Sequence, residues 1–294
     1  MEGIEKYRKA GKIAVEVRKF GEPLVRPGIR VLDIADKIEK KIMELGGKPA
    51  FPVNISSNDN AAHDTADIND TRVIGEGDVV KLDFGVHVDG YIVDTAATIC
   101  LNKDFSDMHK VSQLALEEAL KLFRPGGTIK EVSEVIEKTI REGGFNPISN
   151  LTGHGLERYD LHARMEVPNV KTNIDYTLKE GDVFSVEPFV TNGGGYVIEG
   201  ASALIYGYEH DGRIRLREGT KILEMAKTKF DALPFAGRWL AGSIPTIKLK
   251  IALNQLSQIG ALHSYAVLRE RENGIVVQSE HSVIVGDKPE ILTL

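Results

Sequence analysis

The sequence predicts an α+β fold of two related halves, with a helical segment inserted late in the chain. Three observations predict it: a repeated succession of turn, helix, histidine and strand, apolar runs that carry single acidic residues, and a long stretch between the last two of those runs. The length of 294 residues suits one large domain with an insertion and allows a buried core. Hydrophobic residues make up 42% of the chain and charged residues 27%, as in ordinary globular proteins.

Charge, cysteine content and the N-terminal residues restrict the class of protein. A net charge of −6 argues against a chain whose whole surface holds nucleic acid. Cys100 is the one cysteine, so an internal disulfide is impossible and an intracellular protein is expected. The first residues lack the apolar core of a signal peptide, and no run approaches the ~18 apolar residues of a membrane span. We therefore expect a cytoplasmic protein with no membrane partner.

The first part of the repeat is a turn followed by a helix. Arg26-Pro27-Gly28 recurs as Arg124-Pro125-Gly126, and Ile38-Glu39-Lys40 recurs at the same offset as Ile136-Glu137-Lys138. Apolar residues at helical spacing surround both tripeptides, and a glycine pair, the usual helix stop, ends each pattern. One helix of each half is therefore expected over these residues.

The second part of the repeat is a polar loop followed by a strand. One loop holds His63 and its equivalent holds His162. The tetrapeptide Glu-Gly-Asp-Val at residues 76–79 recurs at 180–183 and opens an apolar run each time, with Asp83 and Glu187 at equal depth in those runs. We interpret the repeat as two pseudo-symmetric αβ halves packed around a shared centre, where equivalent acidic residues converge.

Two aspartates lie on a predicted hairpin. The β-branched runs 79–86 and 91–99 are separated by a turn signal at 87–90. A turn centred on residues 88 and 89 places Asp83 directly opposite Asp94, whereas a turn centred on residues 89 and 90 slips the pairing by two residues but keeps both carboxylates on one face. Like charges on one sheet face are destabilising, and burying them unpaired costs more. A shared proton or a multivalent cation must then neutralise them, unless one aspartate faces water or caps a turn.

Two further acidic residues interrupt apolar runs. Glu187 follows Val183–Val186, and Glu280 lies within the β-rich run 275–285. Carboxylates with an imidazole suit a hard or borderline divalent metal, and two metals need about this many ligands. His154 is the best imidazole candidate because flanking glycines let the backbone present its ring tightly at a turn. His63 and His162 could be further ligands or could contact a substrate.

These residues carry a resemblance to a known family. Asp83, Asp94, His154, Glu187 and Glu280, in that order and at those spacings, resemble the five ligands of the pita-bread metallopeptidases, which include methionine aminopeptidases, proline-specific peptidases and creatinase. The segment Gly153–His162 resembles the type II (archaeal and eukaryotic) methionine aminopeptidase pattern, as do residues 48–54 followed by Ala61-Ala62-His63. The resemblance covers essentially the whole chain and implies the pita-bread fold. Family members often have Phe where this chain has Ser279, which affects local packing.

The distance from Glu187 to Glu280 predicts an insertion. It is much longer than two adjacent strands need, and type II members similarly carry a helical insert of winged-helix character there. Residues 220–259 show helical periodicity broken by Pro234 and Pro245. We expect a catalytic domain over 1–194 and 272–294 and a helical subdomain over 195–271. That subdomain has 11 Lys and Arg against 7 Asp and Glu, so it could help the protein dock on a ribosome, or it could be an ordinary solvated surface.

The resemblance also implies a metal arrangement. Asp94 and Glu280 would bridge two divalent ions, Asp83 would complete one, and His154 with Glu187 would complete the other. A hydroxide held between the ions would attack the carbonyl after the first residue of the substrate. Cobalt, manganese, iron and zinc all suit such a carboxylate-rich site.

The remaining site residues follow from the same resemblance. His162 would stabilise the oxyanion, Glu187 would pass a proton to the leaving amine, and His63 would hold the substrate backbone. Phe51, Leu161 and Phe189 match positions that line the family's methionine pocket, although each could equally be ordinary core packing. The implied activity is removal of the initiator methionine from nascent polypeptide N-termini when the second residue is small, by a protein expected to be a monomer.

Two other interpretations remain. A proline-specific dipeptidase shares the five ligands, but such enzymes usually carry a large extra N-terminal domain, and here the first half begins almost at residue 1. A non-catalytic member of the fold that binds RNA or protein would have lost metal ligands, whereas this chain keeps all five. We therefore expect an enzyme.

Overall fold

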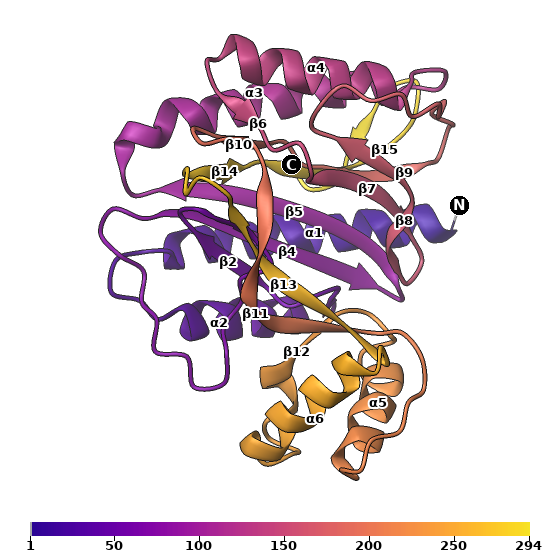
Figure 1. Cartoon of the computed structure of the whole chain (residues 1–294). Helices are drawn as coiled ribbons and strands as arrows, with labels where there is room; N and C mark the ends of the chain where they lie inside the picture. The colour runs from indigo at the N-terminus through magenta and orange to yellow at the C-terminus, as the bar shows by residue number, and fades with distance from the viewer. Residues whose placement is uncertain (1) are drawn as a thin grey trace.

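A curled, nine-stranded antiparallel sheet forms the centre of the computed structural model, which describes residues 2–294 (Figure 1). Its main path runs β1-β4-β5-β15-β9-β7-β8, with β2 beside β4 and β16 beside β15. Strand β15 therefore joins the strands of the first half to those of the second. The strands are β1 Lys48–Pro49, β2 Asn54–Ser57, β4 Val79–Val88, β5 Tyr91–Cys100, β7 Thr152–Glu157, β8 Asp160–Pro168, β9 Val183–Val186, β15 Glu280–Ile284 and β16 Glu290–Ile291.

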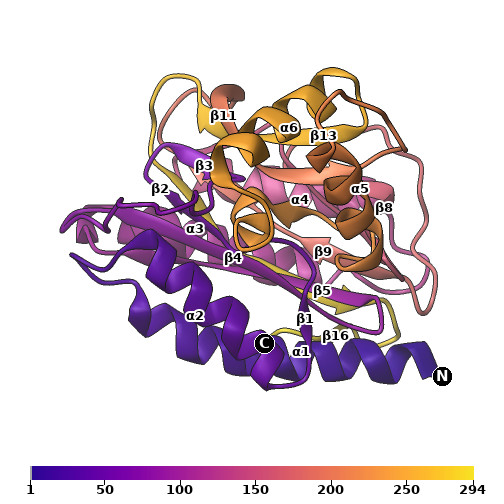
Figure 2. The same ribbon diagram turned by 90° about the horizontal axis from the view of Figure 1, so that it is seen from below.

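Each half contributes a pair of helices. Helices α1 (Glu2–Gly21) and α2 (Val31–Glu44) share a core with β4 and β5, on the side of the sheet away from the inserted helices (Figure 2). Helices α3 (Ser106–Leu120) and α4 (Ile129–Glu142) share a second core with β9. Short 3-10 turns, η1 Glu22–Leu24 and η2 Lys103–Phe105, complete these connections. The two halves predicted from the repeat, and with them the fold class, are confirmed.

The repeated helices form where the repeat predicts them. Helix α4 begins at a capping box, in which the Thr128 side chain accepts from the Glu131 backbone N–H and the Glu131 carboxylate accepts from Thr128. One face of each helix buries isoleucines and valines at helical spacing. Gly46 and Gly144 follow the two helices with φ values of 84° and 83°, a conformation that favours glycine after a helix.

The β4–β5 hairpin closes through a two-residue turn at Asp89 and Gly90. Both have positive φ, 51° and 86°, which suits an Asp-Gly pair. Asp83 therefore pairs with Ala96, and Asp94 pairs with Gly85. The alternative that placed Asp83 directly opposite Asp94 is wrong, because it would have required positive φ at the β-branched Val88.

The tips of two hairpins, one from each half, contact each other. The backbone N–H of Tyr159 donates to the Gly90 carbonyl at 2.8 Å, and Arg158 Nε donates to the Asp89 carbonyl at 3.0 Å. A side chain at position 90 would meet the Tyr159 ring, since a Cβ built there lies 2.4 Å from its nearest atom. The two halves are thus joined at these tips as well as through β15.

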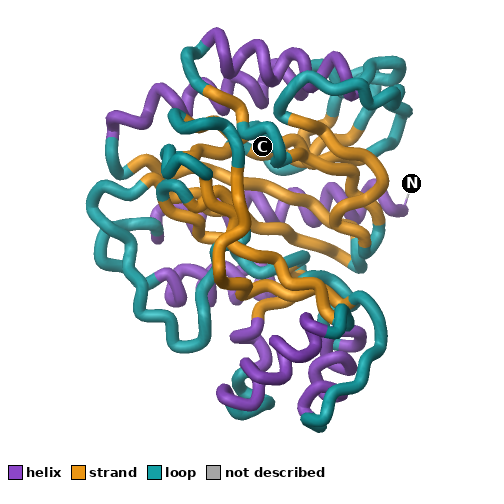
Figure 3. Tube along the Cα trace, viewed as in Figure 1, coloured by secondary structure: helices purple, strands orange, loops and turns teal. Residues whose placement is uncertain are grey.

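The inserted segment leaves and returns on a long pair of strands. Strand β11 (Val197–Tyr208) leads to α5 (Glu218–Thr228), β12 (Phe235–Ala236), η3 (Gly237–Leu240) and α6 (Thr246–Gln258), and β13 (Leu262–Glu270) returns. Strand β13 pairs with β3 (Asn60–Ala62) of the first half, which gives a second sheet in the order β12-β11-β13-β3. The helices project from one end of the molecule around a core of their own (Figure 3).

A small third sheet supports the end of the chain. It has the order β14-β10-β6, with β14 at Val276–Gln278, β10 at Phe189–Thr191 and β6 at Asn146–Pro147. Ser279, just after β14, is buried and its hydroxyl hydrogen-bonds that of Ser112 in α3 at 2.7 Å. Among residues 2–294, no helix has the length and apolar character needed to span a membrane.

Candidate active site

The five candidate ligands lie on two adjacent rows across one face of the central sheet. Antiparallel pairing places Asp83, Ala96 and Glu280 in one row, on β4, β5 and β15. Residues directly paired across strands share a face, so both carboxylates lie on the same face of the sheet as the small Ala96 side chain. The next row holds Asp94 and, across β9, His154, which pairs with Ser185. Glu187 follows β9 two residues beyond Ser185.

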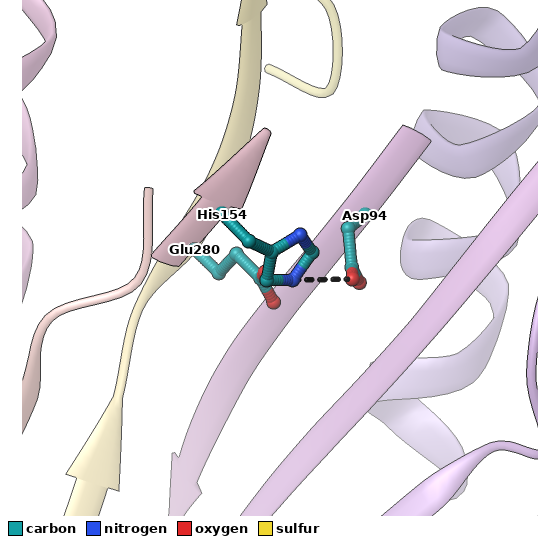
Figure 4. Close-up of side chains that lie close together, drawn as sticks. All are labelled: Asp94, His154 and Glu280. Carbon is teal, nitrogen blue, oxygen red and sulfur yellow. Dashed lines mark ion pairs between the residues drawn. The ribbon is translucent and has the colours of Figure 1, made fainter. Parts of the chain in front are cut away.

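Three of these side chains meet closely. Asp94, His154 and Glu280 each offer one ligand atom, and these atoms lie within 4.8 Å of one another. Figure 4 shows the three side chains pointing toward one another from three strands. His154 Nε2 lies 3.8 Å from Asp94 Oδ2 and 3.7 Å from Glu187 Oε1. The sheet register alone therefore brings together residues that are far apart in the sequence.

The glycines beside His154 have a different role from the one the sequence suggested. His154 lies within strand β7, not at a turn. A Cβ at Gly153 would lie 2.4 Å from the Ser185 carbonyl oxygen, and one at Gly155 would lie 2.3 Å from that of Ala163. Glycine is needed because the neighbouring strands approach closely on both sides. His162 likewise lies in a strand, β8, instead of a polar loop.

The carboxylates are buried with too few partners. Asp83 Oδ1, Asp94 Oδ1 and Glu280 Oε2 are buried and have no hydrogen-bond partner. Burial raises the pKa of Asp83 to about 7, and burial together with the neighbouring carboxylates raises the pKa values of Glu187 and Glu280 well above their usual range. Such a cluster needs protons or a cation, and its oxygen and imidazole donors fit a divalent metal.

Neighbouring side chains orient the acidic residues. Gln278 Nε2 donates to Glu187 Oε2 at 3.1 Å, and Ser185 Oγ donates to Glu280 Oε1 at 2.5 Å. Asn54 Nδ2 lies 3.4 Å from Asp83 Oδ2. Hydrogen bonds of this kind fix the direction in which a ligand oxygen faces a metal.

All three site histidines are neutral near pH 7. Burial lowers the pKa of His154 to about 3 and that of His63 to about 4, and it also lowers the pKa of His162. His63 Nδ1 lies 3.2 Å from the Ala266 carbonyl, so Nδ1 carries the proton and Nε2 is an acceptor. His63 also has a φ of 61°, a strained conformation for a residue with a Cβ. The rings of His154 and His162 pack edge to face with centroids 4.6 Å apart.

The candidate residues line one cavity of about 220 Å³, which has room for a side chain but not for a drug-sized ligand. The lining includes every site residue named from the sequence: Phe51, His63, Asp83, Asp94, His154, Leu161, His162, Glu187, Phe189 and Glu280. Phe51 packs beneath Gly85, where a Cβ would lie 2.5 Å from its ring. Apolar and charged residues thus occupy the same small space.

Sequence reasoning missed part of the lining. Asn54 and Ala62 lie within the segments that carry the family resemblance, and Asn150, Leu151 and Thr152 directly precede another such segment, so that likeness could have found all five. Ile205, Pro234 and Tyr265 come from the inserted segment and complete one wall. They belong to no repeat and to no apolar run with an acidic residue, so no comparable signal marked them.

Comparisons with known proteins agree with this geometry. The model of metallopeptidase family M24 matches residues 5–285. Methionine aminopeptidase from Pyrococcus horikoshii is 48% identical over 283 residues, which cover 96% of each chain. Among solved structures, a thermophilic Arx1 superposes with a TM-score of 0.86 at 18% identity, covering 99% of this chain and 90% of that one. Methionine aminopeptidase from Thermotoga maritima gives 0.73 at 22% identity, covering 99% and 96%.

Proposed function

The chain belongs to metallopeptidase family M24, and on that premise we propose that it is a type II methionine aminopeptidase that works with two divalent ions. It is a metal-dependent aminopeptidase that removes N-terminal methionine. The observation that carries the finer proposal is the meeting of Asp94, His154 and Glu280 inside a small cavity with apolar walls. The 77-residue segment 195–271 supports the type II assignment through its two helices, α5 and α6.

We propose that Asp83, Asp94, His154, Glu187 and Glu280 would hold the two ions, with Asp94 and Glu280 serving both, Asp83 serving one, and His154 with Glu187 serving the other. Four carboxylates and two divalent ions have no net charge, which makes the cluster tolerable in a protein interior. When bound, divalent ions lower the pKa of water and polarise a carbonyl oxygen. Cobalt, manganese, iron and zinc remain candidates because carboxylates and imidazole accept each of them.

The chain's own residues would handle protons and hold the substrate. Glu187 accepts from Gln278 through Oε2, and its Oε1 lies 3.7 Å from His154 Nε2. In the proposed reaction Glu187 would pass a proton to the leaving amine. His63 offers Nε2 as an acceptor for a substrate N–H. His162 stands beside His154, where its neutral ring can donate to the developing oxyanion.

The apolar side of the cavity would take the methionine side chain. Phe51, Leu161 and Phe189 are all buried and line the cavity together. A narrow apolar pocket suits an unbranched, polarisable thioether better than a branched side chain. As in the family, we expect cleavage when the second residue of the substrate is small.

The inserted segment supports a further part of the proposal. Its excess of basic residues suits contact with ribosomal RNA, which would place a monomeric enzyme in the cytoplasm beside emerging N-termini. Replacing Lys221 and Lys229 on the insert with Gln should then reduce cosedimentation with ribosomes at low salt. Unchanged cosedimentation would contradict the docking proposal, and the proposal of peptidase activity would still stand.

A peptide assay tests the main proposal. The purified protein is stripped with a chelator and reloaded with cobalt, manganese, iron or zinc, and the peptides Met-Ala-Ser, Met-Pro and Gly-Pro are supplied. We expect metal-dependent release of methionine from Met-Ala-Ser, with about two metal ions per chain by elemental analysis. Preferential cleavage of Gly-Pro would instead identify a proline-specific dipeptidase.

A further inference from the structure

A glutamate that is not among the candidate metal ligands accepts hydrogen bonds from three donors. Glu39 lies on α2 and is only 6% exposed. Its Oε1 accepts from the backbone N–H of Val53 at 3.2 Å and from Arg238 Nη2, and its Oε2 accepts from Trp239 Nε1 at 2.8 Å. The carboxylate therefore has partners on both oxygens in a place where a charged group is costly.

These three donors do not line the cavity themselves but lie next to segments that do. Val53 lies between Phe51 and Asn54, which both line the cavity. Arg238 and Trp239 lie in η3, directly after β12, and β12 pairs with β11 through Ile205 and Ala236. Ile205, and Pro234 directly before β12, line the cavity as well. Glu39 thus joins the wall made by the first half to the wall made by the insert.

The other ion pairs between the first half and the insert are more exposed than the one between Glu39 and Arg238. Lys48 pairs with Asp231 at 3.1 Å and Lys250 with Asp67 at 2.8 Å. Both lysine side chains are more than half exposed, so these pairs contribute little to stability. The Arg238 side chain is 5% exposed, and its Nε and Nη1 atoms have no hydrogen-bond partner. Glu39 is the one carboxylate within salt-bridge distance of this buried guanidinium in the described chain.

Resting on the proposed function, we propose that Glu39 is a positioning residue that sets the width of the methionine pocket, by holding Arg238 and Trp239 against the segment 51–54. It touches neither substrate nor metal. Its loss should let the insert-derived wall move relative to Phe51, which changes how well the pocket distinguishes side chains of different shape. The metal ligands stand on the central sheet and should keep their places.

The chain offers a matched control for this residue. Glu137 occupies the equivalent position in the repeat, on α4, and also accepts a backbone hydrogen bond, from Lys171 at 2.7 Å. Its other partner is Arg141 of the same helix at 2.8 Å, with side chains 23% and 54% exposed. Glu137→Gln is therefore the same chemical change at a related site that has no contact with the cavity.

The test measures kcat, KM and metal content of wild type, Glu39→Gln, Trp239→Phe and Glu137→Gln, using peptides that begin with Met, Leu or Ile. In Glu39→Gln, the amide NH2 faces a donor whichever way the amide is turned, so the contacts of one oxygen are lost with little change in volume. We expect KM for the Met peptide to rise about 10-fold and the preference for Met over Ile to fall about 10-fold, with kcat nearly unchanged. Trp239→Phe removes one donor and keeps a ring. It should change KM for the Met peptide and the preference for Met over Ile in the same directions, but by smaller factors.

The outcomes separate the two proposals. If wild type releases no methionine, the proposed function fails regardless of Glu39. If wild type is active while Glu39→Gln and Trp239→Phe keep the wild-type KM and side-chain preference, the positioning role is wrong. Should Glu39→Gln fail to fold, Trp239→Phe decides alone. A loss of bound metal, or an equal change in Glu137→Gln, would also overturn the inference.

Discussion

The two halves of the molecule share a plan but contribute differently to the site. Asp83 and Glu187 are equivalents in the repeat, yet Asp83 is bound by Asn54 whereas Glu187 lies beside His154 and is held by Gln278. Glu39 and Glu137 are equivalents as well, yet the insert covers the first and leaves the second partly exposed. Repetition therefore placed the acidic residues, and the surroundings that each half acquired gave them separate roles.

The largest expected difference between the two halves follows from replacing Asp83 and Glu187, one from each half, with the corresponding amides. Glu187→Gln should lower kcat by about 10²–10⁴-fold even at saturating metal, because it removes a proton carrier. Asp83→Asn should weaken metal binding, so that added metal restores much of the rate. Steady-state kinetics across a metal titration measures both. Equal residual rates in the two variants at saturating metal would show that the halves do not differ in this way.

A second prediction concerns the acidic cluster that the halves share. Without metal, the raised pKa values of Asp83, Asp94, Glu187 and Glu280 mean that the folded chain binds more protons than the unfolded chain, whose carboxyls titrate near pH 4. The free energy of unfolding of the metal-free protein should therefore fall as the pH rises from about 4 through 7 and above. The slope is up to about 1.4 kcal/mol per pH unit for each extra proton that the folded chain binds.

Thermal unfolding measures this effect. Melting temperatures taken with chelator and with saturating manganese between pH 5 and pH 8 should diverge as the pH rises, because the metal replaces protons on the same oxygens. A metal-dependent gain that is the same at every pH would contradict the raised pKa values.

The wall contributed by the first half can be tested by itself. Phe51→Ala removes an apolar surface of the cavity while leaving the metal ligands intact, so KM for a Met peptide should rise about 10-fold with a smaller change in kcat. Peptide kinetics, with metal content as the control, gives the answer. If kcat falls as much as kcat/KM does, Phe51 supports the chemistry and not the binding of the side chain.

The smallest expected effect concerns Glu137 on α4, which is compared with Glu39 at the equivalent position of α2. Glu137→Gln replaces one partner of a partly exposed pair with Arg141, and it should lower the free energy of unfolding by only about 0.5–1 kcal/mol. Urea unfolding followed by circular dichroism would measure it against Glu39→Gln, which leaves a buried arginine without its anion and should cost more. Equal losses would mean that burial beneath the insert has no energetic consequence.

Much of this arrangement was predictable because it follows from periodic patterns. The alternation within β4 and β5 put Asp83 and Asp94 on one face, and the repeat supplied Glu187 and the helices α2 and α4. The turn register remained open until the positive φ values of Asp89 and Gly90 were known.

The insert-derived part of the site was not predictable, and Glu39 shows why. The tripeptide Ile38-Glu39-Lys40 has the pattern of a helix surface, as its repeat-related copy at 136–138 does. What buries Glu39 is contact with residues about 200 positions later in the chain, and such packing leaves no periodic signal in the sequence. Tyr265 and Pro234 also line the cavity, and no sequence pattern predicted that position for either residue.

The contact between the two hairpin tips has an evolutionary consequence. Because Tyr159 donates to the Gly90 carbonyl and its ring occupies the space where a side chain at position 90 would stand, neither turn can grow without displacing the other. Chains of this architecture should therefore show coordinated changes, in which a longer loop in one half is matched by a shorter or redirected loop in its counterpart. Elsewhere on the periphery, loop lengths should drift independently.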